Sequence, residues 1–232
     1  MERLSDALDG IISGDRFISI TGGGGKTSLL KCLASYYRDK GEKVLMTTTT
    51  KFQSPLFFRW DADLETSEES QAFSFEKRPG ICLFGKKTPD VKKWQSPDLE
   101  ILSTLWRSYD RTICEADGSR QLPLKMHREC DPVIMTGSTR TIAVMGIWAL
   151  GKKAYQEVWG YDGDEEIDSS FLSWYINAPE GLLKGGADIV IANGAECAGE
   201  REMEILRNAE WPDGVKVLAS SIREDRLLEV IA

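Results

Sequence analysis

The sequence contains little of what several common classes of protein require. Only one of its 232 residues is histidine, and its five cysteines are scattered with no Cys-x-x-Cys pair. Structural zinc sites and disulfide frameworks need clustered or paired residues of these types, so neither is supported. Acidic residues outnumber basic ones, with a formal net charge of −8. This balance argues against a nucleic-acid binder and against a protein that docks on anionic membranes.

Long apolar runs are also missing. No run approaches the ~18 apolar residues of a membrane-spanning helix, and the start MERLSDALDG lacks the apolar core of a signal peptide. We therefore expect a cytoplasmic protein. The chain shows no internal repeat and no low-complexity linker, so we expect residues 1–232 to form a single domain. Residues 52–95 and 152–184 are expected to be irregular or inserted segments.

The chain does contain a regular alternation of short β-branched runs and amphipathic segments. Such repeated alternation favours an α/β fold with a mainly parallel sheet and helices on both faces. The patterns predict strands at 16–20, 43–50, 80–85, 111–117, 139–147, 187–194 and 215–221, and helices at 28–41, 96–109 and 199–209.

Residues 17–34, FISITGGGGKTSLLKCLA, place four glycines, a lysine and a threonine between a predicted strand and a predicted helix. This is the context of a phosphate-binding P-loop, so we expect a P-loop NTPase-like fold. Backbone N–H groups of residues 22–27 would surround the β-phosphate, where side chains would block the approach. Lys26 would bridge the β- and γ-phosphates, and Thr27 would hold Mg²⁺. The alternative is a glycine-rich turn that binds nothing. The expected nucleotide-binding residues are Gly22, Gly23, Gly24, Gly25, Lys26, Thr27 and Ser28, with Mg²⁺ and ATP or GTP as cofactors.

The stretch TICEADGS ends an apolar strand in two acids, Glu115 and Asp117. Strand-end carboxylates of this kind reach Mg²⁺ or its water shell in P-loop proteins, so both acids and Lys26 are candidate catalytic residues. The alternative is a pair of surface acids. Arg120 and Lys125 follow and are candidates for holding an anionic substrate, although basic loop residues are often only solvated. We expect Asp117, Arg120 and Lys125 to line one cleft.

The stretch VLMTTTTKF supplies four hydroxyls after the second predicted strand. Alternation of side chains would send Thr47 and Thr49 to one face and Thr48 and Thr50 to the other. One of the four could complete the metal shell beside Thr27 and Glu115, and Thr49 is our candidate. Threonine also simply suits strands, so the choice among the four stays open.

A weaker signal, IVIANGAE, follows a later strand. Asn193 and Glu196 stand where guanine-specific P-loop proteins carry Asn-Lys-x-Asp, whose amide and acid read the base. Here the lysine is missing and the acid is one methylene longer. The alternative is a plain loop. The sequence therefore does not decide whether the nucleotide is ATP or GTP.

Five blocks in order, ITGGGGKTSLL, VLMTTTTKF, EADGSRQLPLK, DPVI and MGIWALGKK, resemble the YqeC family of selenium-cofactor biosynthesis proteins. The resemblance implies a P-loop protein associated with maturation of selenium-dependent molybdenum hydroxylases. Its expected partners are a nucleotide, a molybdopterin-type cofactor and an apo molybdenum hydroxylase. The chain departs from the family at Cys130, where a histidine is common. The lone His127 is expected to be a polar loop residue, and Cys114 is expected to point into the core.

Two classes of function remain open. The first is an enzyme that couples nucleotide hydrolysis or phosphoryl transfer to modification of a cofactor. The second is a nucleotide-gated chaperone that carries cofactor to an apo-enzyme and hydrolyses nucleotide slowly. A small-molecule kinase or ligase unrelated to selenium is a further alternative.

Overall fold

The computed structural model describes residues 2–232. A nine-stranded sheet runs through the molecule in the order β14-β13-β12-β10-β1-β8-β2-β5-β4. All neighbouring strands pair in parallel except β13 and β14 at one edge, which are antiparallel. The strands of this sheet are β1 (Phe17–Gly22), β2 (Lys43–Thr48), β4 (Leu64–Thr66), β5 (Gly80–Phe84), β8 (Arg111–Glu115), β10 (Arg140–Gly146), β12 (Ile189–Asn193), β13 (Lys216–Ser221) and β14 (Arg226–Val230).

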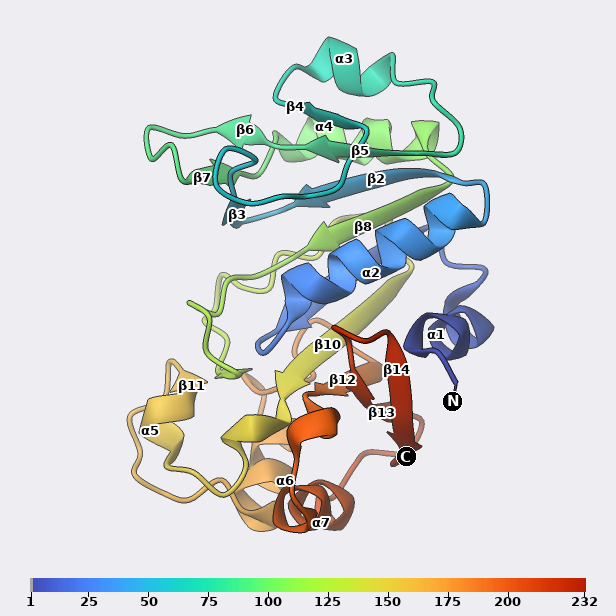
Figure 1. Cartoon of the computed structure of the whole chain (residues 1–232). Helices are drawn as coiled ribbons and strands as arrows, with labels where there is room; N and C mark the ends of the chain where they lie inside the picture. Colours follow the sequence, from blue (N-terminus) through green and yellow to red (C-terminus); the bar gives the residue numbers. More distant parts are fainter. Residues whose placement is uncertain (1) are drawn as a thin grey trace.

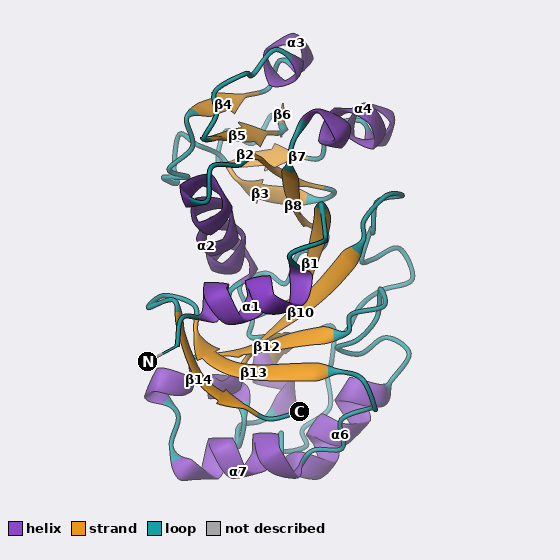
Figure 2. Ribbon diagram, turned by 90° about the vertical axis from the view of Figure 1, so that its right-hand side faces the viewer, coloured by secondary structure: helices purple, strands orange, loops and turns teal. Residues whose placement is uncertain are grey.

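Helices cover both faces of this sheet. In Figure 2, α1 and α2 lie on one side of the strands and α4 lies on the other. The helices are α1 (Leu4–Ile12), α2 (Lys26–Asp39), α3 (Glu69–Phe73), α4 (Leu99–Leu105), α5 (Ala154–Glu157), α6 (Ser169–Asn177) and α7 (Glu200–Asn208), with the short 3₁₀ turns η1 (Trp106–Ser108), η2 (Ile147–Ala149) and η3 (Ala195–Cys197). The expected α/β fold is confirmed, and it is consistent with a P-loop NTPase-like fold.

The two faces of β1 show why the helices divide in this way. Side chains alternate along a strand, so Ile18 and Ile20 point to one face and pack in the cluster that contains Leu29 and Leu33 of α2. Phe17 points to the other face, into the cluster formed with α4. Since apolar side chains leave β1 on both sides, the strand is stable only with a helix layer on each face.

Two smaller sheets lie beside the central one. The three-stranded sheet consists of β3 (Lys51–Gln53), β7 (Lys93–Gln95) and β6 (Lys86–Lys87), paired antiparallel, and a second pair joins β9 (Leu124–Lys125) to β11 (Val158–Trp159). The segment 52–95, expected to be irregular or inserted, therefore contains regular elements. Apart from β5, which the sequence predicted at 80–85, the strands of this segment are two or three residues long. They are too short for side-chain alternation to reveal.

The parallel strands bring the candidate motifs to one edge of the sheet. The register pairs Ile20 of β1 with Glu115 of β8, and Thr48 of β2 also pairs with Glu115. Figure 1 shows the arrowheads of β2 and β8 pointing the same way, past the start of α2. In open parallel sheets, ligands bind beyond the carboxyl ends of the strands. No helix within residues 2–232 is long and apolar enough to cross a membrane.

Candidate functional site

The glycine run joins the end of β1 to the start of α2 and passes close to neighbouring backbone. Gly22 and Gly24 have positive φ angles of 91° and 66°. A Cβ atom on Gly22 would lie 2.3 Å from the carbonyl oxygen of Val144, and one on Gly24 would lie 2.2 Å from the nitrogen of Gly146. Contacts this short are sterically forbidden, so the close packing of the loop against β10 requires glycine at both positions.

The loop does not present all of its N–H groups to a ligand, contrary to the expectation for residues 22–27. The N–H groups of Gly22, Gly23 and Gly24 donate to acceptors of the protein itself. Those of residues 25–28 have no acceptor within residues 2–232. These four belong to the first turn of α2, where a helix leaves its N–H groups unpaired and its dipole attracts anions. The free N–H groups of the loop are therefore gathered at the N-terminus of α2, where an anion could accept from them.

Lys26, at the start of α2, is nearly buried and held by acids. Its Nζ atom lies 3.1 Å from Oδ1 of Asp117 and 4.0 Å from Oε1 of Glu115, and it donates to the carbonyl oxygen of Gly22 at 2.5 Å. The lysine thus lies beside the free N–H groups with its charge balanced by carboxylates. A phosphate at this helix end would compete with these acids for the ammonium group.

Asp117 is completely buried and does not line a cleft. Its Oδ2 atom accepts from the Gly22 N–H at 2.9 Å and lies 2.7 Å from Nε2 of His127 and 3.6 Å from Nζ of Lys125. Burial alone would raise the pKa of Asp117, but Lys26, the hydrogen bond from His127 and Lys125 together hold it well below its ordinary range. Asp117 therefore holds the glycine loop in place by accepting from the Gly22 N–H. His127 is a buried hydrogen-bond partner of Asp117 and not the polar loop residue that we had expected.

Lys125 and Thr49 also lie away from the position that the sequence suggested. Lys125 is fully buried, with Nζ 3.0 Å from Asp131, so it cannot contact a substrate in a cleft. The Thr49 hydroxyl donates to the carbonyl oxygen of Val133 at 2.8 Å. The Thr48 hydroxyl donates to the carbonyl oxygen of Glu115. These threonines bond backbone carbonyl groups at the strand ends, and neither of them lines the cleft that contains Thr27.

Thr27 and Glu115 form the part of the site that suits a magnesium ion. The Thr27 hydroxyl donates to Oε2 of Glu115 at 3.0 Å. Burial raises the pKa of Glu115 and outweighs the opposing effects of Lys26 and Thr27. No group of three or more His, Cys, Asp or Glu side chains is placed to hold a metal in the described chain.

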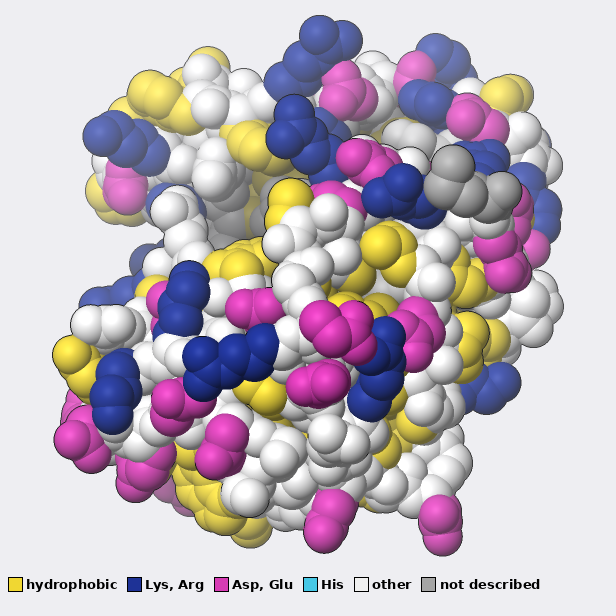
Figure 3. Space-filling model, turned by 60° about the horizontal axis from the view of Figure 1, so that its bottom comes forward, with side chains coloured by type: hydrophobic (Ala, Val, Ile, Leu, Met, Phe, Trp, Pro, Cys, Tyr) yellow, Lys and Arg dark blue, Asp and Glu magenta, His cyan; other side chains and the backbone are white. Residues whose placement is uncertain are grey.

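A cleft of about 410 Å³ opens in front of this pair. Figure 3 shows the molecule deeply hollowed on the left, between its upper and lower parts. Arg120 lines the cleft, as expected for a substrate-binding residue, and it and Gln121 have positive φ angles of 50° and 69°. Such conformations are costly for these residue types and are often found at functional sites. The cleft is lined by Gly24, Gly25, Lys26, Thr27, Ser28, Lys51, Phe52, Gln53, Lys93, Glu115, Gly118, Ser119, Arg120, Gln121, Trp148 and Asn193.

Lys51, Lys93 and Trp148 in this cleft were not identified from the sequence. Lys51 closes the block VLMTTTTKF and Trp148 lies in MGIWALGKK, so their membership of these blocks was the available signal. Lys93 had no such signal. Its position in the cleft follows from the pairing of β7 with β3.

Asn193 lies at the loop, but both ends of its amide are already bonded. Its Nδ2 donates to the carbonyl oxygen of Gly24 at 2.7 Å, and its Oδ1 accepts from the N–H of Ile222 at 3.0 Å. It thus ties the P-loop to the end of β13. We had expected the Asn193 amide to bind the base of a nucleotide, but its donor and its acceptor both bond to the backbone of the protein.

A second cavity of about 570 Å³ adjoins the cleft and shares Ser28, Trp148 and Asn193 with it. We call it the Trp148 pocket. It is also lined by Glu196, whose Oε2 is buried and has no hydrogen-bond partner in the described part of the chain. Trp148 is 40% exposed. The pocket therefore combines an aromatic surface with an acceptor that lacks a donor.

Cys197 lines the Trp148 pocket, and the other four cysteines line neither of these two cavities. Burial, together with Glu115, raises the pKa of the Cys114 thiol to about 12, so it is a core residue as expected. Cys130 is exposed.

Comparisons with known proteins agree with the resemblance. The model of the family described as "YqeC protein" matches residues 18–160. A protein of Escherichia coli (strain K12) named "Uncharacterized protein YqeC" is 33% identical over 185 residues, which is 72% of this chain and 70% of the relative. No solved structure matches the chain significantly.

Proposed function

The chain belongs to the YqeC family, and we propose that it is a magnesium–nucleotide-binding protein of the P-loop type. The observation that carries this proposal is the meeting of three groups at the start of α2. These are the unpaired N–H groups of residues 25–28, the ammonium group of Lys26 and the Thr27–Glu115 pair. A helix N-terminus with an adjacent lysine and a hydroxyl–carboxylate pair supplies all the protein groups that a Mg²⁺–triphosphate needs.

Each of these residues has a task that follows from its position. The free N–H groups would bind phosphate oxygens, and Lys26 would leave the Asp117 carboxylate to contact the β- and γ-phosphates. Thr27 and Glu115 would hold the magnesium ion directly or through its water. When bound, Mg²⁺ neutralises charge on the phosphates. Arg120 lies on the same cleft and would face the terminal phosphate or an anionic second substrate.

We place the base of the nucleotide in the Trp148 pocket. The pocket adjoins the phosphate site through Ser28 and Asn193, and its aromatic side chain can stack on a purine. Glu196 offers an acceptor without a donor, which suits the N–H groups at guanine N1 and N2. This favours GTP over ATP. Since Asn193 is bonded to the protein, the preference would depend on Glu196 alone.

We further propose that the protein acts in maturation of the selenium-containing molybdenum cofactor of molybdenum hydroxylases. It would couple nucleotide hydrolysis or phosphoryl transfer to modification of a molybdopterin-type cofactor. The support is the ordered set of motif blocks shared with the family. The apo molybdenum hydroxylase would be the protein partner.

Turnover experiments test this function against that of a nucleotide-gated chaperone. Phosphate release is measured with purified protein and Mg²⁺–GTP or Mg²⁺–ATP, alone, with molybdenum cofactor, and with an apo-hydroxylase. Stimulation by the cofactor alone supports the coupled enzyme, whereas stimulation only by the apo-hydroxylase supports the chaperone. Absence of nucleotide binding by calorimetry would contradict both.

A further inference from the structure

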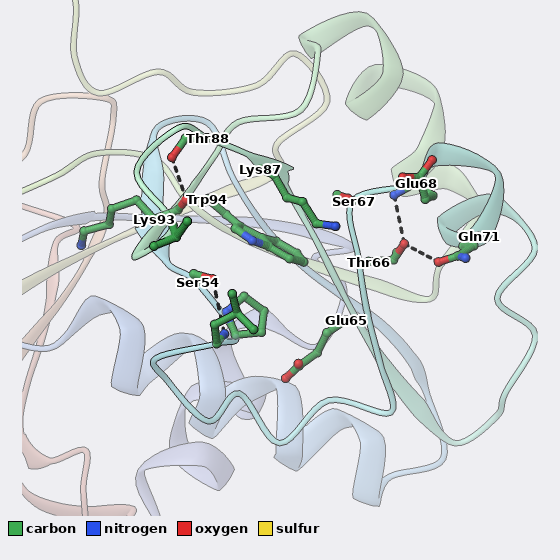
Figure 4. Close-up of a pocket in the computed structure, with 13 residues that line it drawn as sticks. Ser54, Glu65, Thr66, Ser67, Glu68, Gln71, Lys87, Thr88, Lys93 and Trp94 are labelled. Carbon is green, nitrogen blue, oxygen red and sulfur yellow. Dashed lines mark hydrogen bonds between the residues drawn. The ribbon is translucent and has the colours of Figure 1, made fainter.

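A cavity of about 480 Å³ lies beside the nucleotide cleft, in the segment that connects β2 to α4. We call it the hairpin pocket, because β6 and β7 form one of its walls. Figure 4 shows Trp94 on one side, Glu65 opposite it, and Thr66 and Ser67 at one end. Its size is that of sites for small molecules, which typically range from ~300 to 1,000 Å³. It is lined by Ser54, Pro55, Leu56, Glu65, Thr66, Ser67, Glu68, Gln71, Lys87, Thr88, Val91, Lys93 and Trp94.

The wall between this pocket and the nucleotide cleft is the β3–β7 ribbon. Successive side chains of a strand point to opposite sides. Lys93 lines the nucleotide cleft, and in Figure 4 its side chain extends away from the pocket, while Trp94 faces into it. The carbonyl oxygen of Lys93 accepts from the Thr88 hydroxyl at 2.9 Å on the pocket side. One residue therefore contacts both cavities.

The chemistry of the pocket combines an apolar wall with two unpaired charges of opposite sign. Leu56 and Val91 are 79% and 59% exposed at its mouth, beside the ring of Trp94. Neither the Glu65 carboxylate nor the Lys87 ammonium has an ion-pair or hydrogen-bond partner within residues 2–232. The neighbouring Lys86, in contrast, pairs with Asp98 at 2.6 Å. Glu65 is an exposed residue, and partial burial of its carboxyl together with the nearby Asp61 raises its pKa.

We propose that the hairpin pocket binds the second substrate of the nucleotide-dependent reaction and that this substrate is a small heteroaromatic acid. The ring would lie against Trp94 and Leu56, a ring N–H would donate to Glu65, and the anionic group would pair with Lys87. This assignment rests on the proposed function for the role of the site, whereas the binding itself depends only on the pocket.

The shared wall gives the pocket its position relative to the phosphates. Lys93 lines the nucleotide cleft together with Glu115, and it also lines the hairpin pocket. A molecule in the hairpin pocket would therefore approach the terminal phosphate at Lys93. The Trp148 pocket borders the same cleft through Ser28, Trp148 and Asn193 and shares no residue with the hairpin pocket.

Binding is tested with three aromatic acids, and cyclohexanecarboxylate is the non-aromatic control. Orotate carries both the carboxylate and ring N–H groups, whereas nicotinate and quinoline-3-carboxylate carry the carboxylate and the ring without an N–H at neutral pH. Saturation-transfer NMR on the full chain without nucleotide should detect at least one of the aromatic acids and not the control. The variant Lys87→Gln should weaken binding about tenfold, because a charge-assisted contact is lost. The matched variant Lys86→Gln should bind as the wild type does. If no probe binds the wild type, or if both lysine variants bind equally, the pocket assignment is overturned.

The role as second-substrate site is tested separately with Mn²⁺ in place of Mg²⁺. With Mn²⁺–nucleotide bound at α2, the proton relaxation of the bound probe should increase, because the two cavities share a wall. Lys26→Ala should remove this effect while leaving probe binding intact. An unchanged relaxation rate in a protein that binds both nucleotide and probe would overturn the second-substrate role. A protein that binds the probe but no nucleotide would instead contradict the proposed function.

Discussion

Nζ of Lys26 lies 3.1 Å from Oδ1 of Asp117, and both side chains are almost entirely buried. The P-loop lysine is therefore neutralised by an acid of the neighbouring strand end. When a nucleotide binds, the first event would be that the Lys26 ammonium group leaves the Asp117 carboxylate and pairs with a phosphate.

Lys26→Ala should lower Mg²⁺–nucleotide affinity at least about tenfold, equivalent to ~1.4 kcal/mol, because the cation next to the phosphates is lost. The fold should persist, since Asp117 keeps its contacts with Gly22, His127 and Lys125. Calorimetry measures the affinity, and circular dichroism checks the fold. Lys31→Ala, on the same helix with its ammonium paired to Asp61, is the matched control and should bind normally. Wild-type affinity in Lys26→Ala would falsify the nucleotide site.

Glu115→Gln should leave nucleotide binding nearly unchanged and slow phosphate release. The pKa of Glu115 is raised by burial, so in the folded protein the carboxyl is still partly protonated above its ordinary value of 4.5. If turnover needs the ionised carboxylate, the wild-type rate should rise with pH through this raised pKa. The residual rate of Glu115→Gln should lack that rise. Stopped assays of phosphate release measure the dependence of the rate on pH for the wild type and for Glu115→Gln. If the two rates depend on pH in the same way, Glu115 is not the group whose ionisation controls turnover.

Asp117→Asn should destabilise the protein by about 3–5 kcal/mol at neutral pH, because a buried carboxylate that balances several cations is lost. The pKa of Asp117 is lowered in the folded state. Its contribution is thus fully present above the ordinary value of 3.8 and is lost as pH falls through the lower folded pKa. Urea unfolding at neutral and acidic pH should therefore show a gap between wild type and variant that narrows in acid. The exposed Asp39→Asn is the control, and a pH-independent gap would contradict the linkage.

Trp148→Ala should weaken GTP and ATP alike, because stacking does not distinguish purines and is worth about 1–3 kcal/mol per base. Glu196→Ala should instead reduce the preference for GTP, since adenine offers no donor in place of guanine N1 and N2. Calorimetry of both variants with both nucleotides separates the two effects. If the wild type binds GTP and ATP equally and Glu196→Ala leaves both affinities unchanged, Glu196 does not read the base and residues 193–196 form an ordinary loop.

The sequence predicted the parts of the site that lie within a few residues of one another. The run from β1 into α2 was recognisable because glycine, lysine and threonine follow one another in a fixed order. Glu115 was recognisable because it ends an apolar strand, and parallel pairing then places it opposite Ile20. In contrast, the two- and three-residue strands β3, β6 and β7 left no periodic pattern. The hairpin pocket that they border was therefore not predicted.

The sequence by itself determined the alternating strands and helices and the position of the glycine loop between β1 and α2, because these depend on local patterns of apolar residues and glycine. Only the tertiary structure decided which polar groups are free. Asp117, Thr49 and Asn193 have the residue types of a binding site, yet each bonds to backbone groups far away in the chain. Lys125 is also of such a type, yet its buried ammonium pairs with Asp117 and Asp131. A buried polar group must find a hydrogen bond. Which groups the fold uses for this, and which it leaves for a ligand, depends on contacts that local sequence does not encode.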